Sequence, residues 1–208
     1  GCDDNLIILM LHQIVFRAMG SQIFVAVESP LPPTELNNVS NWFEEWEESL
    51  SRFRPNSELS KVNRVASMPT EVSQTFADVF ETALSAEQNS EGLVTPVLLD
   101  AINELGYDRS FDLLPLQSDI FHPQVFSAQP HLDEVSWEAS TRTICLPPNM
   151  QLDFGGTAKG WAALQAAQRL GKFGPALVNA GGDISISSAR KDDEPWRVGI
   201  ANPFKRSE

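Results

Sequence analysis

Residues 152–160 read Leu-Asp-Phe-Gly-Gly-Thr-Ala-Lys-Gly, the most informative stretch of the chain. Its adjacent glycines, Gly155 and Gly156, let the backbone turn sharply and come close to a ligand. The helix expected after them offers free N–H groups and a positive dipole end, which suit a phosphate group. Lys159 adds a cation, and Asp153 adds a carboxylate for a ribose or a ring nitrogen. The spacing matches neither a Walker loop nor G-x-G-x-x-G, so an ordinary tight turn and a phosphate cradle both stay open.

The sequence around this turn predicts a helix and several strands. Residues 158–170 are rich in alanine and are followed by a glycine, which is typical of a helix and its end. A short strand is expected at 151–154 and another at 176–178. Residues 184–186 and 196–200 alternate apolar and polar side chains, which predicts that they pair as an antiparallel hairpin.

A second glycine pair, Gly181-Gly182, predicts a tight turn between strands. Asp183 follows it directly. An aspartate here either caps the turn through its own backbone, which is the commoner use, or ligates a metal ion.

The first half of the chain predicts a buried strand followed by helices. Residues 22–27 are apolar on both faces, as in a buried strand. Thr34, Ser57 and Ser73 are expected to cap the helices that follow. Pro96 suits the first turn of a short helix that ends near residue 106.

The first of these helices carries apolar residues at three- and four-residue spacing, which form its inner stripe: Leu36, Val39, Phe43, Trp46, Leu50 and Phe53. On this pattern Phe53 is interpreted as core filling. The acidic residues between them are interpreted as a solvated helix face and not as a metal site: Glu44, Glu45, Glu47 and Glu48.

Beyond the helices, residues 107–131 show little periodicity and predict mostly loop. Residues 135–137 and 143–146 then predict a hairpin. Helices gather early and strands late, which is an α+β pattern with antiparallel or mixed sheets packed against helices. We expect residues 1–13 to be a flexible terminal extension and residues 14–208 to form a single domain.

The composition limits the partners. The formal net charge of −13 argues against nucleic acid or an anionic membrane surface. The longest apolar run near the start, residues 6–11, is too short to span a bilayer. Two cysteines, Cys2 and Cys145, cannot form a disulfide framework. So acidic a protein must hold a diphosphate through backbone N–H groups, local cations or a divalent metal.

Four blocks of sequence point to one family. FRAMGS at 16–21 resembles F-x-A-M-G-T, and SRFRPNSELSKVN at 51–63 resembles S-x-[YF]-R-P-x-S-E-[LI]-S-x-[LI]-N. LDFGGTAKGW at 152–161 resembles L-D-[LFV]-G-[GA]-[IV]-A-K-G-[YW]. LVNAGGDI at 177–184 resembles [LA]-[LIV]-[NS]-[LA]-G-G-[DN]-[IL]. Because the blocks keep the family's order and spacing over nearly the whole chain, the sequence resembles the ApbE family.

The resemblance implies an activity and a set of partners. Members of the family are FAD:protein FMN transferases with a T-fold-related architecture. They bind FAD and Mg²⁺, attach FMN to a threonine or serine hydroxyl of a client protein and release AMP, while some relatives hydrolyse FAD instead. Many are lipid-anchored on the periplasmic side of the bacterial cell envelope, but nothing in residues 1–20 separates that location from the cytoplasm.

The resemblance also implies roles for particular residues. The expected contacts with FAD come from Met19, Phe53, Leu93, Val94, Thr95, Asp153 and Lys159. In this set Phe53 stands where the family has a stacking aromatic ring, so its core interpretation acquires an alternative. The backbone carbonyl of Gly156 is the expected metal ligand.

Two departures from the family pattern leave alternatives open. Residues 92–97, Gly-Leu-Val-Thr-Pro-Val, replace the acidic G-x-F-D-P-T segment. The chain also carries neither H-[IV]-x-[DN]-P-x-T-G nor D-x-x-[AS]-T-A, which supplies metal ligands in the family. The alternatives are a fragment, a short relative whose site a second copy completes, and a flavin-nucleotide-binding or interaction domain without catalysis.

Overall fold

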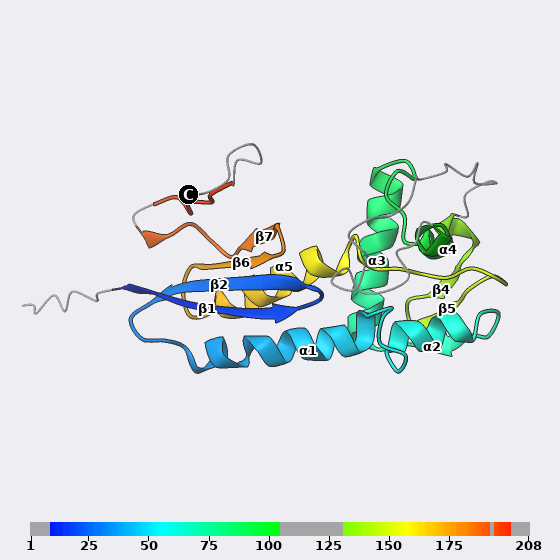
Figure 1. The fold of residues 1–208 in the computed structure, drawn as a ribbon, viewed down its shortest axis with the longest axis horizontal. Helices are drawn as coiled ribbons and strands as arrows, with labels where there is room; N and C mark the ends of the chain where they lie inside the picture. The colour runs from blue at the N-terminus through cyan, green and yellow to red at the C-terminus, as the bar shows by residue number, and fades with distance from the viewer. Residues whose placement is uncertain (1–8, 105–130, 192–193, 201–208) are drawn as a thin grey trace, which may run out of the picture.

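The computed structural model describes residues 9–104, 131–191 and 194–200. Two antiparallel sheets lie at the two ends of this part of the molecule, with helices packed around and between them (Figure 1). The larger sheet has the strand order β1 (Met10–Ala18), β2 (Ser21–Ser29), β6 (Ala176–Ala180) and β7 (Asp183–Ile186). The smaller has the order β3 (Thr70–Glu71), β5 (Thr143–Cys145) and β4 (Ser136–Glu138).

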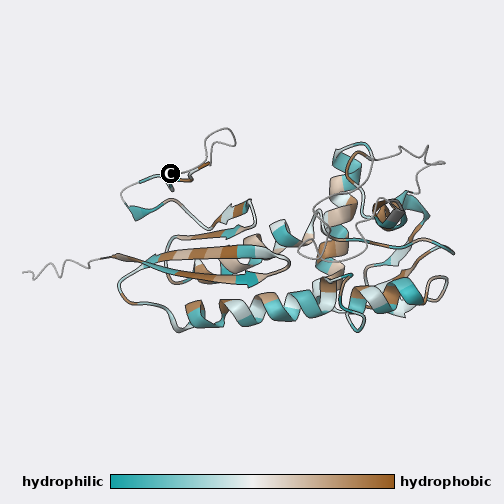
Figure 2. Cartoon of the chain, viewed as in Figure 1, coloured by the Kyte–Doolittle hydropathy of each residue, from teal (hydrophilic) through white to brown (hydrophobic). Residues whose placement is uncertain are grey.

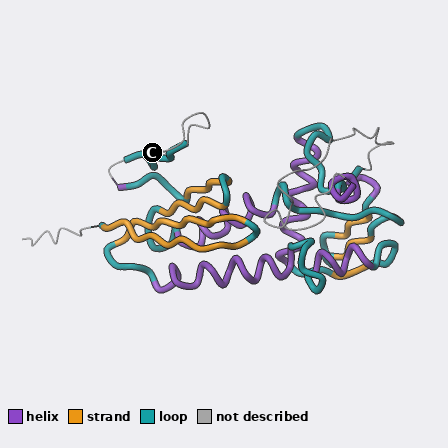
Figure 3. The backbone as a smooth tube through the Cα atoms, viewed as in Figure 1, coloured by secondary structure: helices purple, strands orange, loops and turns teal. Residues whose placement is uncertain are grey.

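Helices cover one face of the large sheet and surround the small one, as the tube in Figure 3 shows. In chain order they are η1 (Thr34–Asn38), α1 (Val39–Leu50), α2 (Glu58–Arg64), α3 (Gln74–Asn89), α4 (Leu99–Glu104), η3 (Leu132–Glu134) and α5 (Ala158–Leu170). The α+β class predicted from the sequence is confirmed. No helix in the described ranges is both long and apolar enough to cross a membrane.

The hairpin of β1 and β2 pairs without a break from Met10 with Ser29 to Ala18 with Ser21. Only Met19 and Gly20 remain to make the turn. β1 therefore takes in residues 10–13 of the range that we assigned to a terminal extension. Residues 1–8 lie outside the described part, and the single domain over 14–208 stays a prediction.

The core runs from the large sheet, with α1 and α5 packed on it, through α3 to the small sheet. Figure 2 shows apolar segments along β1 and β2. The inward side chains of β2 and β6 are fully buried: Ile23, Val25, Val27, Ala176, Val178 and Ala180. α5 faces them with fully buried alanines at 162, 163, 166 and 167. Small side chains let this helix approach the sheet closely, and this packing positions its first turn.

Local helix signals were largely confirmed. The Ser57 hydroxyl accepts a hydrogen bond from the Ser60 N–H at 3.0 Å, and the Ser73 hydroxyl accepts one from the Phe76 N–H at 3.1 Å, as N-caps do. Thr34 makes no cap: it begins the 3-10 helix η1, and α1 starts only after it.

Two predicted strands were wrong. Residues 151–154 form no strand, because the backbone N–H and C=O of Leu152 pair with the side-chain amide of Asn63, both at 2.9 Å. Residues 184–186 do form a strand, within β7, but it pairs with β6. Residues 196–200 form no strand in the described part of the chain, so the hairpin predicted between these two runs is wrong. The Trp196 indole N–H instead donates to the Ser188 carbonyl at 3.0 Å.

Other elements agree with the sequence. The hairpin at 135–137 and 143–146 appears as β4 and β5, although β3, which pairs with β5, was not predicted. The helix expected after Pro96 is α4, three residues further on. Residues 107–130 of the loop predicted at 107–131 lie outside the described ranges.

A buried carboxylate ties residues 190–191 to β2. Glu28 accepts hydrogen bonds from the Arg190 guanidinium at 3.0 Å and from the Lys191 N–H at 3.1 Å. Burial by itself would raise the pKa of Glu28, but these hydrogen bonds and the two positive charges outweigh it and lower the pKa below 4.5. Glu28 therefore stays ionised and holds residues 190–191 against the sheet.

Candidate functional site

A pocket of about 430 Å³ opens beside the β1–β2 turn and the start of α5. Three segments far apart in the sequence form its walls: the β1–β2 turn, the end of α1 with the loop after it, and the start of α5. The lining residues are Met19, Gly20, Ser21, Glu47, Leu50, Ser51, Arg52, Phe53, Arg54, Asp153, Phe154, Gly155, Ala158 and Lys159. The structure thus brings together four predicted site residues: Met19, Phe53, Asp153 and Lys159.

The turn at Met19 and Gly20 is conformationally demanding. Both residues have positive φ, 50° and 68°, as the favoured two-residue hairpin turn requires. Glycine adopts this conformation freely, whereas a methionine there is strained by roughly 1–2 kcal/mol. Strain of this kind persists only where the surroundings hold it, and it gathers at functional sites.

Phe53 does not fill the core. α1 ends at Leu50, and the chain turns away before Phe53, whose side chain is 40% exposed and lines the pocket. The Arg52 guanidinium lies 4.2 Å from the centre of its ring. The helical phase that predicted a core residue was therefore wrong, because the helix stops one turn earlier than the apolar pattern does.

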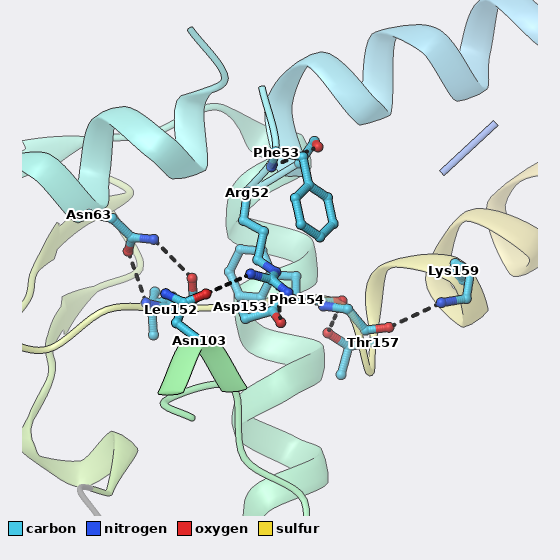
Figure 4. Close-up of polar contacts among 11 residues, drawn as sticks. Arg52, Phe53, Asn63, Asn103, Leu152, Asp153, Phe154, Thr157 and Lys159 are labelled. Atoms are coloured by element: carbon cyan, nitrogen blue, oxygen red, sulfur yellow. Dashed lines mark hydrogen bonds and ion pairs between the residues drawn. The ribbon is translucent and has the colours of Figure 1, made fainter. Parts of the chain in front are cut away.

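Arg52 lies between Asp153 and Asn103, as the close-up in Figure 4 shows. Its Nε lies 3.4 Å from Oδ2 of Asp153, and both side chains are largely buried, at 7% and 13% exposure. Its other end donates to Oδ1 of Asn103 at 3.0 Å. Oδ1 of Asp153 accepts the Gly155 N–H at 2.8 Å. Asp153 is therefore fixed in orientation by a cation and by the glycine turn.

Lys159 lies in the first turn of α5, beside the helix N-terminus. Its ammonium group donates to the Gly155 carbonyl at 3.3 Å. Thr157, the N-cap residue, makes no side-chain cap hydrogen bond. A lysine and a helix N-terminus at one wall create a local positive field within an acidic protein, which suits a phosphate group.

The second glycine turn supports the same wall from behind. Gly181 has φ +64°, and a Cβ built on it would lie 2.5 Å from the Ser21 hydroxyl oxygen and 3.9 Å from Cδ of Lys159. The predicted tight turn is confirmed, and its first glycine is required by close packing. Asp183 begins β7 and is exposed.

The acidic face of α1 is only partly solvated. Arg54 donates to both carboxylate oxygens of Glu44, at 2.6 and 2.9 Å, and lies 3.5 Å from Glu47. The hydrogen bond from Arg54 holds the pKa of Glu44 below its usual value, and the same bond raises the pKa of Arg54. Glu47 reaches the pocket itself, where its Oε2 accepts the Met19 N–H at 3.0 Å.

Other predicted site residues lie outside this lining. Leu93 is 88% and Val94 45% exposed, and Thr95 is partly buried. Their segment still lies next to the pocket lining, because the N–H of Asp153, a lining residue, donates to the Pro96 carbonyl at 2.7 Å. The roles of residues 93–95 stay predictions.

The donors for Mg²⁺ are incomplete in the described ranges. Gly156, the expected carbonyl ligand, is exposed next to the pocket. The nearby Asp153 carboxylate already faces Arg52 and the Gly155 N–H. No group of three or more His, Cys, Asp or Glu in the described ranges is placed to hold a metal ion. Since Mg²⁺ demands an octahedral shell of oxygens, these residues by themselves do not make its site.

Sequence reasoning missed Arg52, Arg54 and Glu47 as pocket residues. Glu47 carries a readable signal: it stands four residues after Phe43 and three before Leu50, at the border of the apolar stripe, where a side chain is partly covered. Arg52 carries none, because its role depends on Asp153, which is distant in sequence.

Comparison with known proteins fits this geometry. A family model described as the ApbE family matches residues 19–208. The chain belongs to the ApbE family. The match begins at Met19, the strained residue of the pocket, and takes in all three segments of its wall.

Individual relatives agree on the family. The FAD:protein FMN transferase of Vibrio cholerae is 26% identical over 170 residues, which cover 79% of this chain and 50% of that protein. The ApbE protein of Thermotoga maritima superposes with a TM-score of 0.78 at 18% identity, covering 94% of this chain and 65% of the other. The Pseudomonas stutzeri flavinyl transferase ApbE, apo form, gives 0.75 at 20% identity, covering 92% and 63%.

These solved ApbE structures confirm the fold. The chain spans about half the length of the curated relatives it matches.

Proposed function

We propose that this chain binds FAD in the pocket between the β1–β2 turn, the loop after α1 and the start of α5. In the proposal it serves Mg²⁺-dependent transfer of FMN to a client threonine or serine hydroxyl. The observation that carries the proposal is the convergence of Met19, Phe53, Asp153 and Lys159 on one pocket. The ApbE relatives named FAD:protein FMN transferase support the choice of ligand.

The proposed pose follows from the chemistry of each wall. An exposed phenylalanine and a thioether in the same pocket suit a planar ring system, which they would contact by stacking and by sulfur–aromatic interaction. Lys159 and the N-terminus of α5 suit the diphosphate. Asp153, held by Arg52, offers a carboxylate to a ribose hydroxyl or a ring nitrogen.

The reaction is proposed as a displacement at phosphorus. The client hydroxyl oxygen forms a bond to the FMN phosphorus and gives its proton to solvent. The bond from that phosphorus to the bridging oxygen breaks, and AMP leaves with that oxygen. Water in place of the hydroxyl gives FAD hydrolysis. The contribution of Lys159 is to hold the diphosphate in line for this attack, which is catalysis by positioning and charge. A magnesium ion held by Gly156 together with further ligands would neutralise charge on the phosphates.

The first experiment is a titration of the protein into FAD, followed by fluorescence anisotropy, with Mg²⁺ and then with chelator. We expect saturable binding that Mg²⁺ strengthens, and AMP release that chelator stops. Lys159→Ala should weaken binding by about tenfold, since it removes a charged contact. Lys172→Ala is the matched control, because Lys172 is an exposed cation just beyond the other end of α5.

The other outcomes discriminate among functions. Binding that ignores Mg²⁺, without AMP, identifies a non-catalytic flavin-nucleotide module and rejects the transferase. Free FMN with no labelled client identifies a hydrolase. Absence of binding rejects the proposal for this chain.

A second copy of the chain that completes the site belongs to the same proposal. It predicts that AMP release per protein rises with protein concentration, together with dimer formation in sedimentation. A rate per protein that is constant across the monomer–dimer range contradicts this part.

A further inference from the structure

We propose that Glu47 is a positioning residue that holds Met19 in its left-handed turn and so fixes the Met19 side chain at the pocket wall. The inference rests on the proposed function for the identity of the ligand, FAD, but its effect on the turn is measurable without any ligand.

The contacts of Glu47 join two walls of the pocket. Glu47 lies in the last turn of α1, with 21% of its side chain exposed. Its Oε2 accepts the Met19 N–H at 3.0 Å and lies 3.5 Å from a guanidinium nitrogen of Arg54. Both partners line the pocket. One carboxylate oxygen therefore connects the β1–β2 turn to the loop after α1.

The turn needs such a partner. Met19 has φ 50°, a conformation that a side chain with a Cβ adopts at a cost. Met19 lies in the turn beyond the last strand pair, Ala18 with Ser21, and its N–H donates to Oε2 of Glu47 at 3.0 Å. A hydrogen bond to a carboxylate is stronger than one to a neutral oxygen. Glu47 thus stabilises the turn at the residue where the backbone is strained.

Arg54 keeps the Glu47 carboxylate in place. It is held in turn by two short hydrogen bonds to Glu44 on the same helix. The resulting chain of contacts runs from Glu44 to Arg54 to Glu47 to Met19, and its last three members line the pocket. Glu45, on the same helix, has no part in this chain: it is exposed and lines the neighbouring groove.

The test uses Glu47→Ala, Glu47→Gln and the matched control Glu45→Ala. The chain has four methionines, so labelling with ¹⁵N-methionine gives four backbone amide signals. Without ligand, we expect the Met19 amide to lose its exchange protection and shift upfield in Glu47→Ala. Glu47→Gln retains an acceptor oxygen, so it should keep most of the exchange protection and most of the chemical shift of the Met19 amide. Glu45→Ala should leave the signal unchanged.

The FAD titration supplies the second readout. Glu47→Ala should weaken FAD binding by about tenfold, and Glu47→Gln by about threefold or less. Thermal unfolding of each variant shows that it is folded. A Met19 amide unchanged in Glu47→Ala overturns the inference, whether or not FAD binds. A shifted Met19 amide in Glu47→Ala together with wild-type FAD affinity overturns the link to the pocket. If the wild-type protein binds no FAD, the proposed function fails, but the role of Glu47 in the turn does not.

Discussion

Replacing Met19 with asparagine separates stability from ligand binding. Met19-Gly20 occupies a two-residue hairpin turn with positive φ at both positions. The sequence that best suits such a turn is Asn-Gly, because asparagine tolerates the left-handed conformation. A methionine at this place thus gives up local stability, which suggests that its side chain is needed at the pocket.

The size of the effect follows from two opposing contributions. Relief of left-handed strain should stabilise Met19→Asn by about 1 kcal/mol. Met19 is half-buried and packs against the core, so losing its apolar side chain should cost about 1 kcal/mol, roughly half the value for full burial. The free energy of unfolding should therefore stay within about 1 kcal/mol of the wild type. FAD affinity should fall about three- to tenfold, since a sulfur–aromatic contact is lost.

Two assays measure the two quantities. Urea unfolding followed by tryptophan fluorescence gives stability, and FAD anisotropy gives affinity. Met68→Asn is the control, because Met68 is 63% exposed and does not line the pocket. Unchanged FAD affinity in Met19→Asn would refute the placement of Met19 at the ligand. A loss of more than about 2 kcal/mol would refute the strain argument.

Three further predictions concern other contacts. Asp153→Ala should lower the free energy of unfolding by about 2 kcal/mol, because it removes the carboxylate facing the buried Arg52. Adding Arg52→Met should recover part of this loss. Losses that simply add, when urea unfolding is measured for both single variants and the double variant, contradict the coupling. Gly181→Ala should lower the free energy of unfolding by about 2 kcal/mol or more, through backbone strain and the clash with Ser21. Ser21→Gly should recover part of the lost stability in thermal unfolding. The absence of any recovery argues against the clash. Since the pKa of Glu28 is lowered in the folded protein, its stabilising contribution is present above pH 4.5 and is lost as the pH falls through the folded pKa. Urea unfolding at a series of pH values should therefore show that Glu28→Gln loses less stability on acidification than the wild type. An equal loss in both proteins rejects this prediction.

Several features could be read from the sequence because they depend on neighbours along the chain. The caps at Ser57 and Ser73 act three residues ahead, and α5 follows from its composition and its closing glycine. The Gly181-Gly182 turn needs only backbone freedom. The α+β class and the family followed from such local signals taken in order.

Only the tertiary structure decided how distant segments meet. The clamp of Asn63 on Leu152 spans 89 residues and displaces a strand that local pattern favoured. The early end of α1 moves Phe53 from the core to the pocket, where Asp153 and Arg52 also meet. Sequence periodicity reports which face of an element is apolar, but the partner of a face, and the cavity left between partners, depend on side-chain shape and on hydrogen bonds between segments far apart in the chain.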